Sequence, residues 1–540
     1  MEFSQVDYRD IQGLVRFGHG HLPEAVFCVA QIVDAAKARQ WIGDSLASVT
    51  RAAAGEKPRY AMQLAFTFDG LRELGVPCKV LEGFSHEFQV GMVESSRSRR
   101  LGDVGKNDPD DWEWGTPGGA CPHVLLMIYA EAGALGARED ALKGERWSAA
   151  FHETQRLTTR LDEKEREPFG FVDGVSQPWI DWDGRRDIRQ PPTTEYTNVA
   201  ALGEFLLGYP NEYGYYTDRP LLDPKDDPAG LLPLAEDKPA KRDLGRNGTY
   251  LVLRDLAQNV ADFDTFVDTA VGDGVETPEE KARKALDLKT AMSGRVPADT
   301  PIFPPRPNNT PPWAKVGAVD DPTWVIPPGG PAMPLTPDAI PGVGPKMKDI
   351  WLDQFTFRRD PDGTACPYGA HIRRANPRNA DFPQDTRGLL DKLVRLFGFR
   401  RRHPHADVLS STRFHRVLRR GRSYWDDQAA RRGLRFVCLN ANIARQFEFI
   451  QTSWLANPKF SSLDEDDPLV GAHPDVMMAG AEANQPVKVA TNVLTRPQDS
   501  GIPCRVHGLK QFVTVRGGAY FFMPGIAALR YIAAVKTQRS

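Results

Sequence analysis

The stretch Ala365–Arg378, ACPYGAHIRRANPR, places one histidine among arginines on a short element. His371 stands at its centre, and Arg373, Arg374 and Arg378 follow it. Because a proline disfavours helical backbone at the residue before it, any helix here should end just before the proline of this stretch. An imidazole beside guanidinium groups suits a haem, whose iron binds a histidine nitrogen and whose propionates pair with arginine. The alternative is a histidine with a purely structural role.

Two further stretches favour the haem interpretation. In Phe169–Pro178, FGFVDGVSQP, the motif G-x-x-D-G contains Asp173 and Gly174, and its glycines permit unusual backbone angles and close approach to a flat ligand. In Phe414–Tyr424, FHRVLRRGRSY, Arg419 stands on a predicted strand that ends at a glycine. A carboxylate, an imidazole and an arginine on three separate elements form a set that can cleave peroxide.

In these three stretches the sequence resembles the dye-decolourising peroxidase family of haem proteins. The resemblance covers most of the chain. The G-x-x-D-G turn, the later AHIRR and the still later RRG are specific as a set, although each alone is weak. Further stretches that carry the resemblance are Asp10–Gly13 (DIQG), Leu64–Gly75 (LAFTFDGLRELG), Asn247–Leu253 (NGTYLVL) and Asn442–Trp454 (NIARQFEFIQTSW).

The resemblance implies an α+β fold of the dimeric α+β barrel type, with two ferredoxin-like domains whose antiparallel sheets enclose haem b. We expect the first domain, with the G-x-x-D-G turn, at 1–200, and the second, with the haem-ligand histidine, at 201–540. Long insertions are expected at about 205–245, 275–350 and 379–410. The resemblance also implies hydrogen peroxide and a dye, a phenol or another small reductant as partners.

The hydrophobic pattern by itself supports two α+β units. Ala25–Ile32 is apolar enough for a buried strand, and Asp34 then caps a predicted helix. This strand–helix order recurs after residue 248, beginning with the strand Thr249–Leu253. Near the end of the chain, Gln511–Pro524 is predicted to be a hairpin that turns at Gly517 and the glycine after it.

Asp173 is the candidate acid/base. Heterolytic cleavage of a peroxide needs a proton moved from its inner to its outer oxygen, which a positioned acid/base can do. Because an aspartate stays ionised to lower pH than a histidine, we expect an acidic optimum. The alternative is an Asp-Gly turn residue without chemistry.

Arg419 would stabilise the negative charge that develops on the departing oxygen. Arg420 is its rival for this role. Adjacent side chains of a strand point to opposite faces, so only one of the two can reach the site. The family pattern points to the first, Arg419.

His371 needs a partner for its second ring nitrogen, since a ligating histidine usually donates that N–H to a carboxylate or carbonyl. The resemblance suggests Asn442, where some family members have an aspartate, and Glu448 is the alternative. Arg373 and Arg378 are the candidate cofactor-binding arginines, and Gly174 is the candidate for close approach to the cofactor. Cys366 is a conceivable thiolate ligand, but the proline after it and the resemblance favour the histidine.

Composition excludes several classes of protein. The chain of 540 residues has a net charge of -3, which gives no bulk attraction to nucleic acid or anionic membrane. Its sequence has no apolar run long enough to cross a bilayer, and its first residues, MEFSQVDYRDIQG, have neither a basic nor an apolar signal region. We therefore expect a cytoplasmic protein without nucleic-acid or membrane partners. The six scattered cysteines predict neither a disulfide framework nor a zinc site.

Several features leave alternatives open. A haem-binding or haem-handling protein with little turnover is the second functional hypothesis. The segment from Pro297 to Pro345 contains 15 of the 44 prolines and predicts an extended covering loop or a substrate gate. The basic segment 395–405 favours a solvated surface or contacts with propionates over nucleic acid. Tyr424 and Trp425 lie nearest to the candidate arginine among the aromatic residues that could pass electrons, and core packing is the alternative.

Overall fold

The computed structural model describes most of the chain. The residues that it describes are 6–53, 57–160, 166–171, 173–174, 176–184, 198–272, 277–296, 300–301, 324–325, 333–334, 357, 360, 362–378, 412–426, 431–473, 475–479, 486–498 and 501–535. The Pro-rich segment 297–345, apart from three two-residue strands, and the basic segment 395–405 lie outside them.

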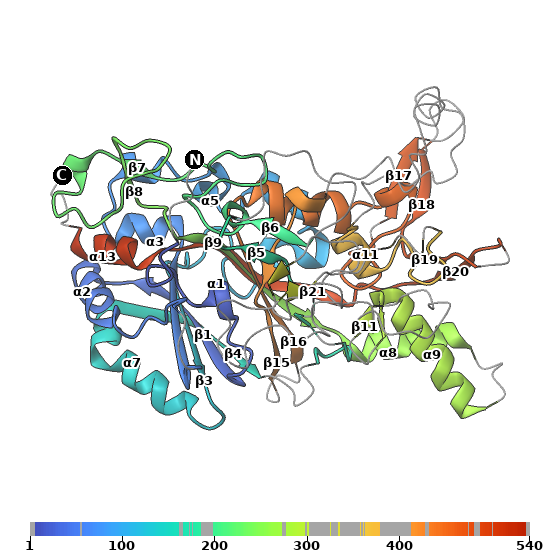
Figure 1. Ribbon diagram of the computed structural model, residues 1–540. Helices are drawn as coiled ribbons and strands as arrows, with labels where there is room; N and C mark the ends of the chain where they lie inside the picture. The colour runs from blue at the N-terminus through green and yellow to red at the C-terminus, as the bar shows by residue number, and fades with distance from the viewer. Residues whose placement is uncertain are drawn as a thin grey trace, which may run out of the picture.

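Nine of the described strands form one antiparallel sheet (Figure 1). The predicted α+β class is therefore confirmed, although the structure has one large sheet where two separate sheets were expected. In hydrogen-bonded order the strands are β14 (Leu418–Arg419), β16 (Arg431–Asn440), β9 (Thr249–Gln258), β21 (Val513–Met523), β2 (Tyr60–Phe66), β3 (Val124–Ala130), β1 (Glu24–Ile32) and β4 (Phe151–Arg160), with β15 (Arg422–Asp426) paired to β16.

The two halves of the chain meet in the middle of this sheet. Strands β1 to β4 come from the first half, and the pair Phe66–Phe522 joins β2 to β21 from the second. The sheet curls so that β15 lies beside β4, where Arg422 Nε donates to Thr159 Oγ1 at 3.1 Å. No backbone ladder between described residues joins these two strands, so the sheet is not a closed barrel. The expected domain boundary near residue 200 stays a prediction.

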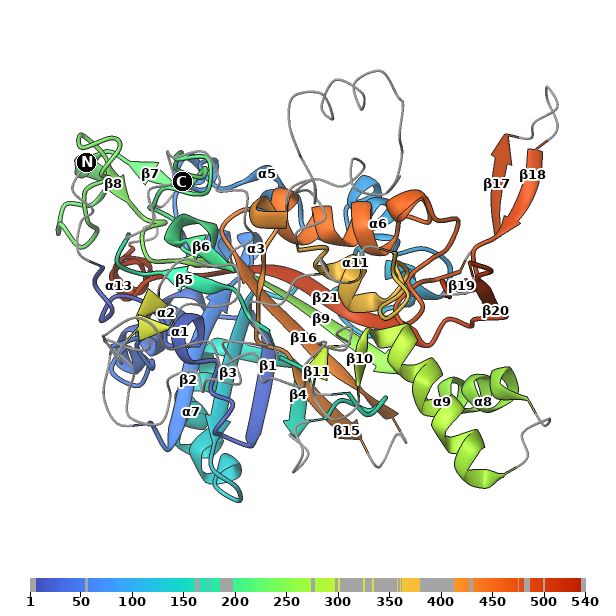
Figure 2. The same ribbon diagram turned by 45° about the vertical axis from the view of Figure 1, so that its right-hand side comes forward.

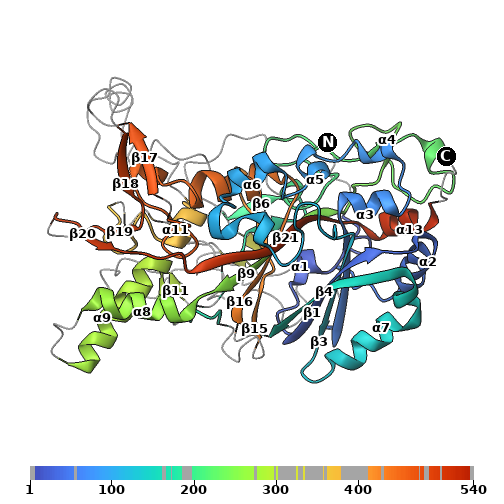
Figure 3. The ribbon, with the colours of Figure 1, turned by 180° about the vertical axis from the view of Figure 1, so that it is seen from behind.

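Both faces of the sheet are buried, which explains why its central strands are almost continuously apolar. Alternate residues of β1 enter two different cores, with Val26 on one face and Phe27 on the other. Helices cover the first face, as Figures 1 and 3 show at one end of the molecule. These helices are α2 (Ala35–Ser45), α7 (Leu135–Ala150) and α13 (Ile526–Ala534). The second face is covered by α1 (Leu14–Phe17) and by residues 199–209.

The predicted cap at Asp34 is confirmed. Its carboxylate accepts the backbone N–H groups of Ala36 and Lys37, each at 3.0 Å, and so satisfies two donors that the first turn of α2 leaves open. The helix then presents Trp41 and Ile42 to the core.

The predicted hairpin at 511–524 is wrong. Residues Val513–Met523 are one continuous strand that pairs with β9 and has a bulge between Val515 and Gly517. A side chain at Gly517 would begin 2.3 Å from Nε1 of Trp114. The glycine is therefore required by the close approach of an indole ring, not by a turn.

The remaining elements surround this sheet. Figure 2 shows that the hairpin of β17 and β18 projects from the body of the molecule. Other short sheets are β5 (Trp179–Asp181) with β6 (Val199–Ala201), β7 (Leu221–Leu222) with β8 (Arg242–Asp243), β10 (Arg295–Val296) with β11 (Thr300–Pro301), β12 (Trp324–Val325) with β13 (Met333–Pro334), β17 (Asp475–Ala479) with β18 (Pro486–Ala490), and β19 (Val493–Arg496) with β20 (Cys504–His507).

Further helices lie mainly in the loops between strands. They are α3 (Phe68–Glu73), α4 (Cys78–Leu81), α5 (His86–Val90), α6 (Ser95–Leu101), α8 (Val260–Val271), α9 (Pro278–Ser293) and α11 (His371–Ala375). The π-helical turns Ala444–Glu448 (η8) and Ile450–Leu455 (η9) follow β16. Within the described part of the chain, no helix combines the length and the apolar character that a bilayer span requires.

Candidate active site

His371 is the first residue of α11, a helix of five residues that ends before Pro377 as the sequence predicts. The adjacent Arg374 is buried and fastens this short helix to the rest of the protein. Its guanidinium donates to the carbonyl oxygens of Trp454 and Asn457, each at 3.2 Å, and of Glu465 at 2.5 Å. The position of His371 is thus determined by η9 and the loop that follows it, not by its own helix alone.

The imidazole of His371 is paired with Asp467. Nδ1 lies 2.9 Å from Oδ2 of this fully buried carboxylate, whose other oxygen accepts the N–H groups of Leu469 at 2.9 Å and Val470 at 3.0 Å. Burial raises the pKa of Asp467, but His371, Arg374 and the backbone N–H groups outweigh it, and the pKa lies below the ordinary value. The carboxylate is therefore ionised and accepts, so Nδ1 carries a proton, and in the neutral ring Nε2 is then the nitrogen with the lone pair.

The expected partners of His371, Asn442 and Glu448, are both wrong. The side chain of Asn442 accepts the N–H of Arg445 at 2.8 Å and so begins η8. Glu448 is buried and accepts from Arg97 Nη1 at 2.8 Å and from the hydroxyl of Tyr520 at 2.9 Å. The true partner follows the histidine by 96 residues in a segment without regular structure, where no local pattern indicates it.

The alternative ligand, Cys366, is fully buried in a small apolar cluster with Phe357 and Ala370. Burial raises the pKa of its thiol to about 12, so this environment favours the neutral thiol over the thiolate. The nearby Arg373 donates to Oδ2 of Asp360 at 3.0 Å and to the carbonyl of Cys366 at 2.6 Å, and so braces the loop before His371. The cofactor contact predicted for Arg373 stays a prediction.

The structure brings Asp173 and Arg419 together. Arg419 Nη1 lies 3.0 Å from Oδ1 of Asp173, and the side chains are 29% and 22% exposed, so the pair remains accessible. Gln177 joins their two segments, because its Oε1 accepts the N–H of Arg419 and its Nε2 donates to the carbonyl of Gly174, each at 3.0 Å. Gly174 has a φ of 80°, a backbone angle that favours glycine.

Arg420 points away from this pair, as expected for the next residue of a strand. Its Nε donates to the carbonyl of Leu14 at 2.8 Å and its Nη2 to that of Val15 at 2.9 Å, so it completes the end of α1. Burial lowers the pKa of Arg420 to about 10. Of the two arginines, Arg419 is the one beside Asp173.

Arg378 connects the three motifs. It is buried, and its Nη2 donates to the hydroxyl of Ser176 in the turn that carries Asp173. Its carbonyl accepts from Thr412 Oγ1 at 2.6 Å, at the start of the segment that leads to Arg419. The end of the histidine stretch, the G-x-x-D-G turn and the arginine segment therefore meet at one residue, through its side chain and its backbone carbonyl.

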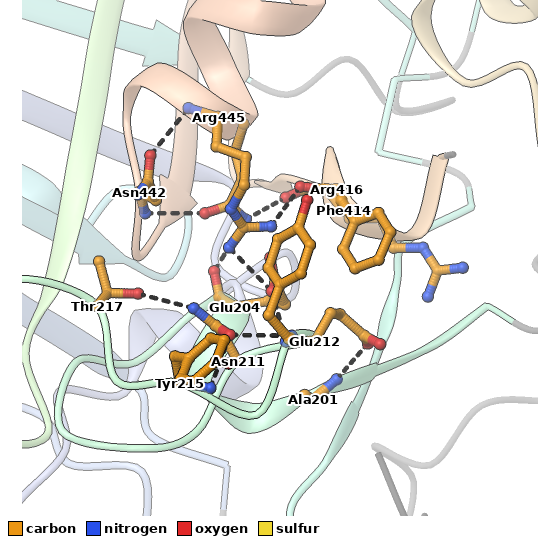
Figure 4. A network of polar contacts seen from close by, with 12 residues as sticks. Ala201, Glu204, Asn211, Glu212, Tyr215, Thr217, Phe414, Arg416, Asn442 and Arg445 are labelled. Carbon is orange, nitrogen blue, oxygen red and sulfur yellow. Dashed lines mark hydrogen bonds and ion pairs between the residues drawn. The ribbon is translucent and has the colours of Figure 1, made fainter. Parts of the chain in front are cut away.

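A buried polar network supports the segment that leads to Arg419 (Figure 4). At its centre Glu204 accepts from Arg445 Nη2 at 2.9 Å, while Arg445 Nη1 donates to the carbonyl of Phe414 at 2.5 Å. Gln446 donates to the carbonyl of Arg416 at 2.5 Å. Sequence analysis did not identify this network, because its members come from distant stretches with no common motif.

The residues present fit a haem. No described residue bonds Nε2 of His371. Because Asp467 accepts from Nδ1, the neutral ring has the tautomer in which Nε2 can bind a metal. A side chain at Gly170, at the start of the G-x-x-D-G turn, would meet no atom of the described residues within 4 Å. Imidazole is a common axial ligand of haem iron.

A second possible metal cluster among the described residues lies elsewhere. Cys28, Glu139 and Glu153 face one another, but Lys143 already occupies the space between the two carboxylates, with Nζ 2.6 Å from Glu139 Oε1. This is an ion-pair cluster between α7 and the strands β1 and β4, and it does not involve the candidate site.

Comparison with known proteins identifies the relatives of this chain. No protein-family model matches it. A dye-decolorizing peroxidase of Mycetinis scorodonius is 26% identical over 542 residues, covering 97% of this chain and 87% of the relative. A multifunctional dye peroxidase of an Amycolatopsis species is 27% identical and covers 75% of this chain and 70% of the relative.

Solved structures show the same fold. The crystal structure of a fungal DyP-type peroxidase from Auricularia auricula-judae matches 98% of this chain and 100% of its own, with a TM-score of 0.63 and 19% identity. That of a DyP-type peroxidase from an Anabaena species matches 97% and 94%, with a TM-score of 0.62 and 20% identity.

Proposed function

The chain belongs to the dye-decolourising peroxidase family, and from this premise we propose that it is a haem peroxidase that uses hydrogen peroxide to oxidise dyes, phenols or other small reductants. The observation that carries the proposal is the accessible pair of Asp173 and Arg419 at 3.0 Å, connected through Arg378 to the stretch that contains His371. A titratable carboxylate beside a permanent cation is the arrangement that peroxide cleavage requires.

In this proposal His371 holds haem b through Nε2, and Asp467 keeps its ring in the required tautomer and orientation. When bound, the haem supplies an iron centre that accepts peroxide and stores the two oxidising equivalents. Arg378 is the proposed partner of a propionate, since its buried guanidinium lies between the histidine stretch and the turn. Gly174 allows the turn to approach the flat cofactor.

Asp173 is the proposed acid/base. It would take the proton from the inner oxygen of hydrogen peroxide and return it to the outer oxygen as that oxygen departs, a task worth roughly 10²–10⁴ in rate. Arg419 holds this carboxylate in place by its ion pair, and its permanent positive charge would stabilise the negative charge on the departing oxygen. Ionised aspartate is retained at low pH, so an acidic optimum remains the prediction.

The reductant is proposed by class. The relatives are named for dyes, and one solved structure of the same fold is a complex of a dye-decolorizing peroxidase with 2,6-dimethoxyphenol, at 20% identity to this chain. We infer dyes and methoxylated phenols as the first substrates to assay.

The test begins with the visible spectrum. Protein produced with sufficient iron should show a Soret band, and His371→Ala should lose it. The double variant Asp173→Asn, Arg419→Leu should keep the band and lose peroxide-driven dye oxidation. A double variant with full activity would refute the assigned roles. A wild type that binds haem without oxidising any dye would instead favour a haem-handling protein.

A further inference from the structure

Glu167 stands where the chain enters the turn that carries Asp173. Its Oε1 accepts the backbone N–H of Phe171 at 2.8 Å, and its Oε2 accepts that of Phe169 at 3.0 Å. The backbone N–H of Glu167 also donates to the carbonyl of Phe171 at 2.8 Å. Residues 167–171 thus form a compact loop closed around one carboxylate.

A third donor ties this loop to the central sheet. Gln258, the last residue of β9, donates from Nε2 to Oε2 of Glu167 at 2.5 Å. Two backbone N–H groups and one amide N–H therefore converge on a single side chain. A carboxylate can accept all three, whereas a glutamine in its place would offer only one oxygen.

Apolar packing holds the same loop from its other side. Phe169 and Phe171 are buried, and the ring of Phe169 lies 4.5 Å from that of Phe263 on α8, measured between centroids. The backbone at Phe171 is therefore fixed both by Glu167 and by its own side chain. Asp173 follows it by two residues, so the clamp determines where the turn begins.

We propose that Glu167 is the positioning residue of the peroxide site: its carboxylate fixes the loop 167–171 so that Asp173 stands against Arg419. This inference rests on the proposed function, because it assigns Glu167 a purpose only if Asp173 acts on peroxide. Glu167 itself touches neither peroxide nor cofactor in this account. It acts through the backbone of the turn.

Gln258 can form a hydrogen bond with Glu167 in both charge states of the carboxyl group. Burial, helped by the charge of Asp173, raises the pKa of Glu167 to about 7, although the three hydrogen-bond donors act in the opposite direction. Among the described residues no donor reaches the buried Oε1 of Gln258. In the present orientation, Nε2 of Gln258 donates to the ionised carboxylate of Glu167. If the amide rotates, its Oε1 can instead accept the proton of the neutral carboxyl group. The clamp is maintained while Asp173 works at acidic pH.

The experiment compares Glu167→Ala with wild-type holoenzyme by two measurements. Hydrogen–deuterium exchange should become faster in peptides covering 168–174, because two backbone N–H groups lose their acceptor. The second-order rate constant for peroxide, per bound cofactor, should fall roughly tenfold to a hundredfold, as expected when an acid/base is misplaced by about 1 Å. The rate constant for the reductant should be unchanged.

Gln258→Leu is the matched control. It removes one donor from the same carboxylate but leaves both backbone bonds, so its effects on the exchange and on the peroxide rate should be smaller than those of Glu167→Ala. Glu167→Gln keeps the size of the side chain and one acceptor, and an intermediate effect on both measurements is expected. If Glu167→Ala does not fold, Glu167→Gln carries the comparison.

The outcomes separate this inference from the proposed function. If Asp173→Asn leaves the peroxide rate unchanged, the proposed function fails. If Asp173→Asn slows that step while the Glu167 variants exchange faster at 168–174 and react normally, the positioning role is overturned. A fall in thermal stability and cofactor content, with an unchanged rate per bound cofactor, would show a merely structural role. A slower rate without faster exchange would also overturn the proposal.

Discussion

At the scale of single residues, the side chain that most affects the chemistry of His371 is Asp467. Its ionised, fully buried carboxylate accepts from Nδ1, which fixes the orientation and the tautomer of the ring. Asp467→Asn should lower cofactor affinity or peroxide reactivity by roughly tenfold to a hundredfold, as is typical for such outer partners. Haem titration of the apoprotein and stopped-flow mixing with peroxide measure the two effects.

The neighbouring Asp466 provides the control for this variant. It accepts from Thr491 Oγ1 at 3.1 Å, while Asp467 is the residue that bonds His371, so Asp466→Asn should leave the affinity of His371 for haem near that of the wild type. Equal effects of the two substitutions would mean that the loop, not the carboxylate on Nδ1, determines cofactor binding.

A pH dependence of stability also belongs to this scale. The pKa of Glu167 is raised from 4.5 to about 7 by burial, so its stabilising contribution is complete below pH 4.5 and is lost as pH rises through about 7. Glu167→Gln cannot titrate. The melting temperature of the variant should therefore lie further below that of the wild type at pH 5 than at pH 8. Calorimetry at both values measures this, and a difference that grows with pH would contradict it.

At the scale of elements, α11 depends on one buried arginine. A helix of five residues is not stable by itself. Arg374 supplies hydrogen bonds to the carbonyl oxygens of Trp454, Asn457 and Glu465. Arg374→Met would leave these oxygens without that donor, at a cost of roughly 2–4 kcal/mol in the free energy of unfolding. Urea denaturation gives the loss, and cofactor content should fall with it. Arg100→Met on an exposed face of α6 should cost little.

At the scale of the whole molecule, the shared sheet predicts that both halves unfold together. Strand β21 lies between β9 and β2, and Phe522 is fully buried at their junction with its ring 4.9 Å from that of Phe84. Phe522→Ala should lower the free energy of unfolding by about 3–5 kcal/mol while leaving a single transition. Tryptophan fluorescence and far-UV circular dichroism should give coincident curves. Two separated transitions would show that the halves are independent domains.

The sequence by itself determined the chemical groups of this protein and its class of fold. The stretches around His371, Asp173 and Arg419 indicated the same family as that of the relatives found by comparison, which are named dye-decolorizing or dye peroxidases. The α+β class and the cap at Asp34 followed from local signals: apolar runs, a capping oxygen, and a proline after a short helix. These signals act over a few residues, where neighbouring backbone and side chains alone decide the outcome.

Only the tertiary structure decided which groups meet. The partner of His371 lies 96 residues away and that of Arg419 lies 246 away, so neither pairing is encoded in local spacing. Gly517 shows the same limit of local sequence patterns. A pair of glycines indicates a turn, whereas the structure shows that the ring of Trp114 packs against Gly517 within a continuous strand. Burial, charge pairing and close approach between distant segments exist only once the sheet has brought them together, which is why Asp467, Glu167 and the single continuous sheet were not predicted.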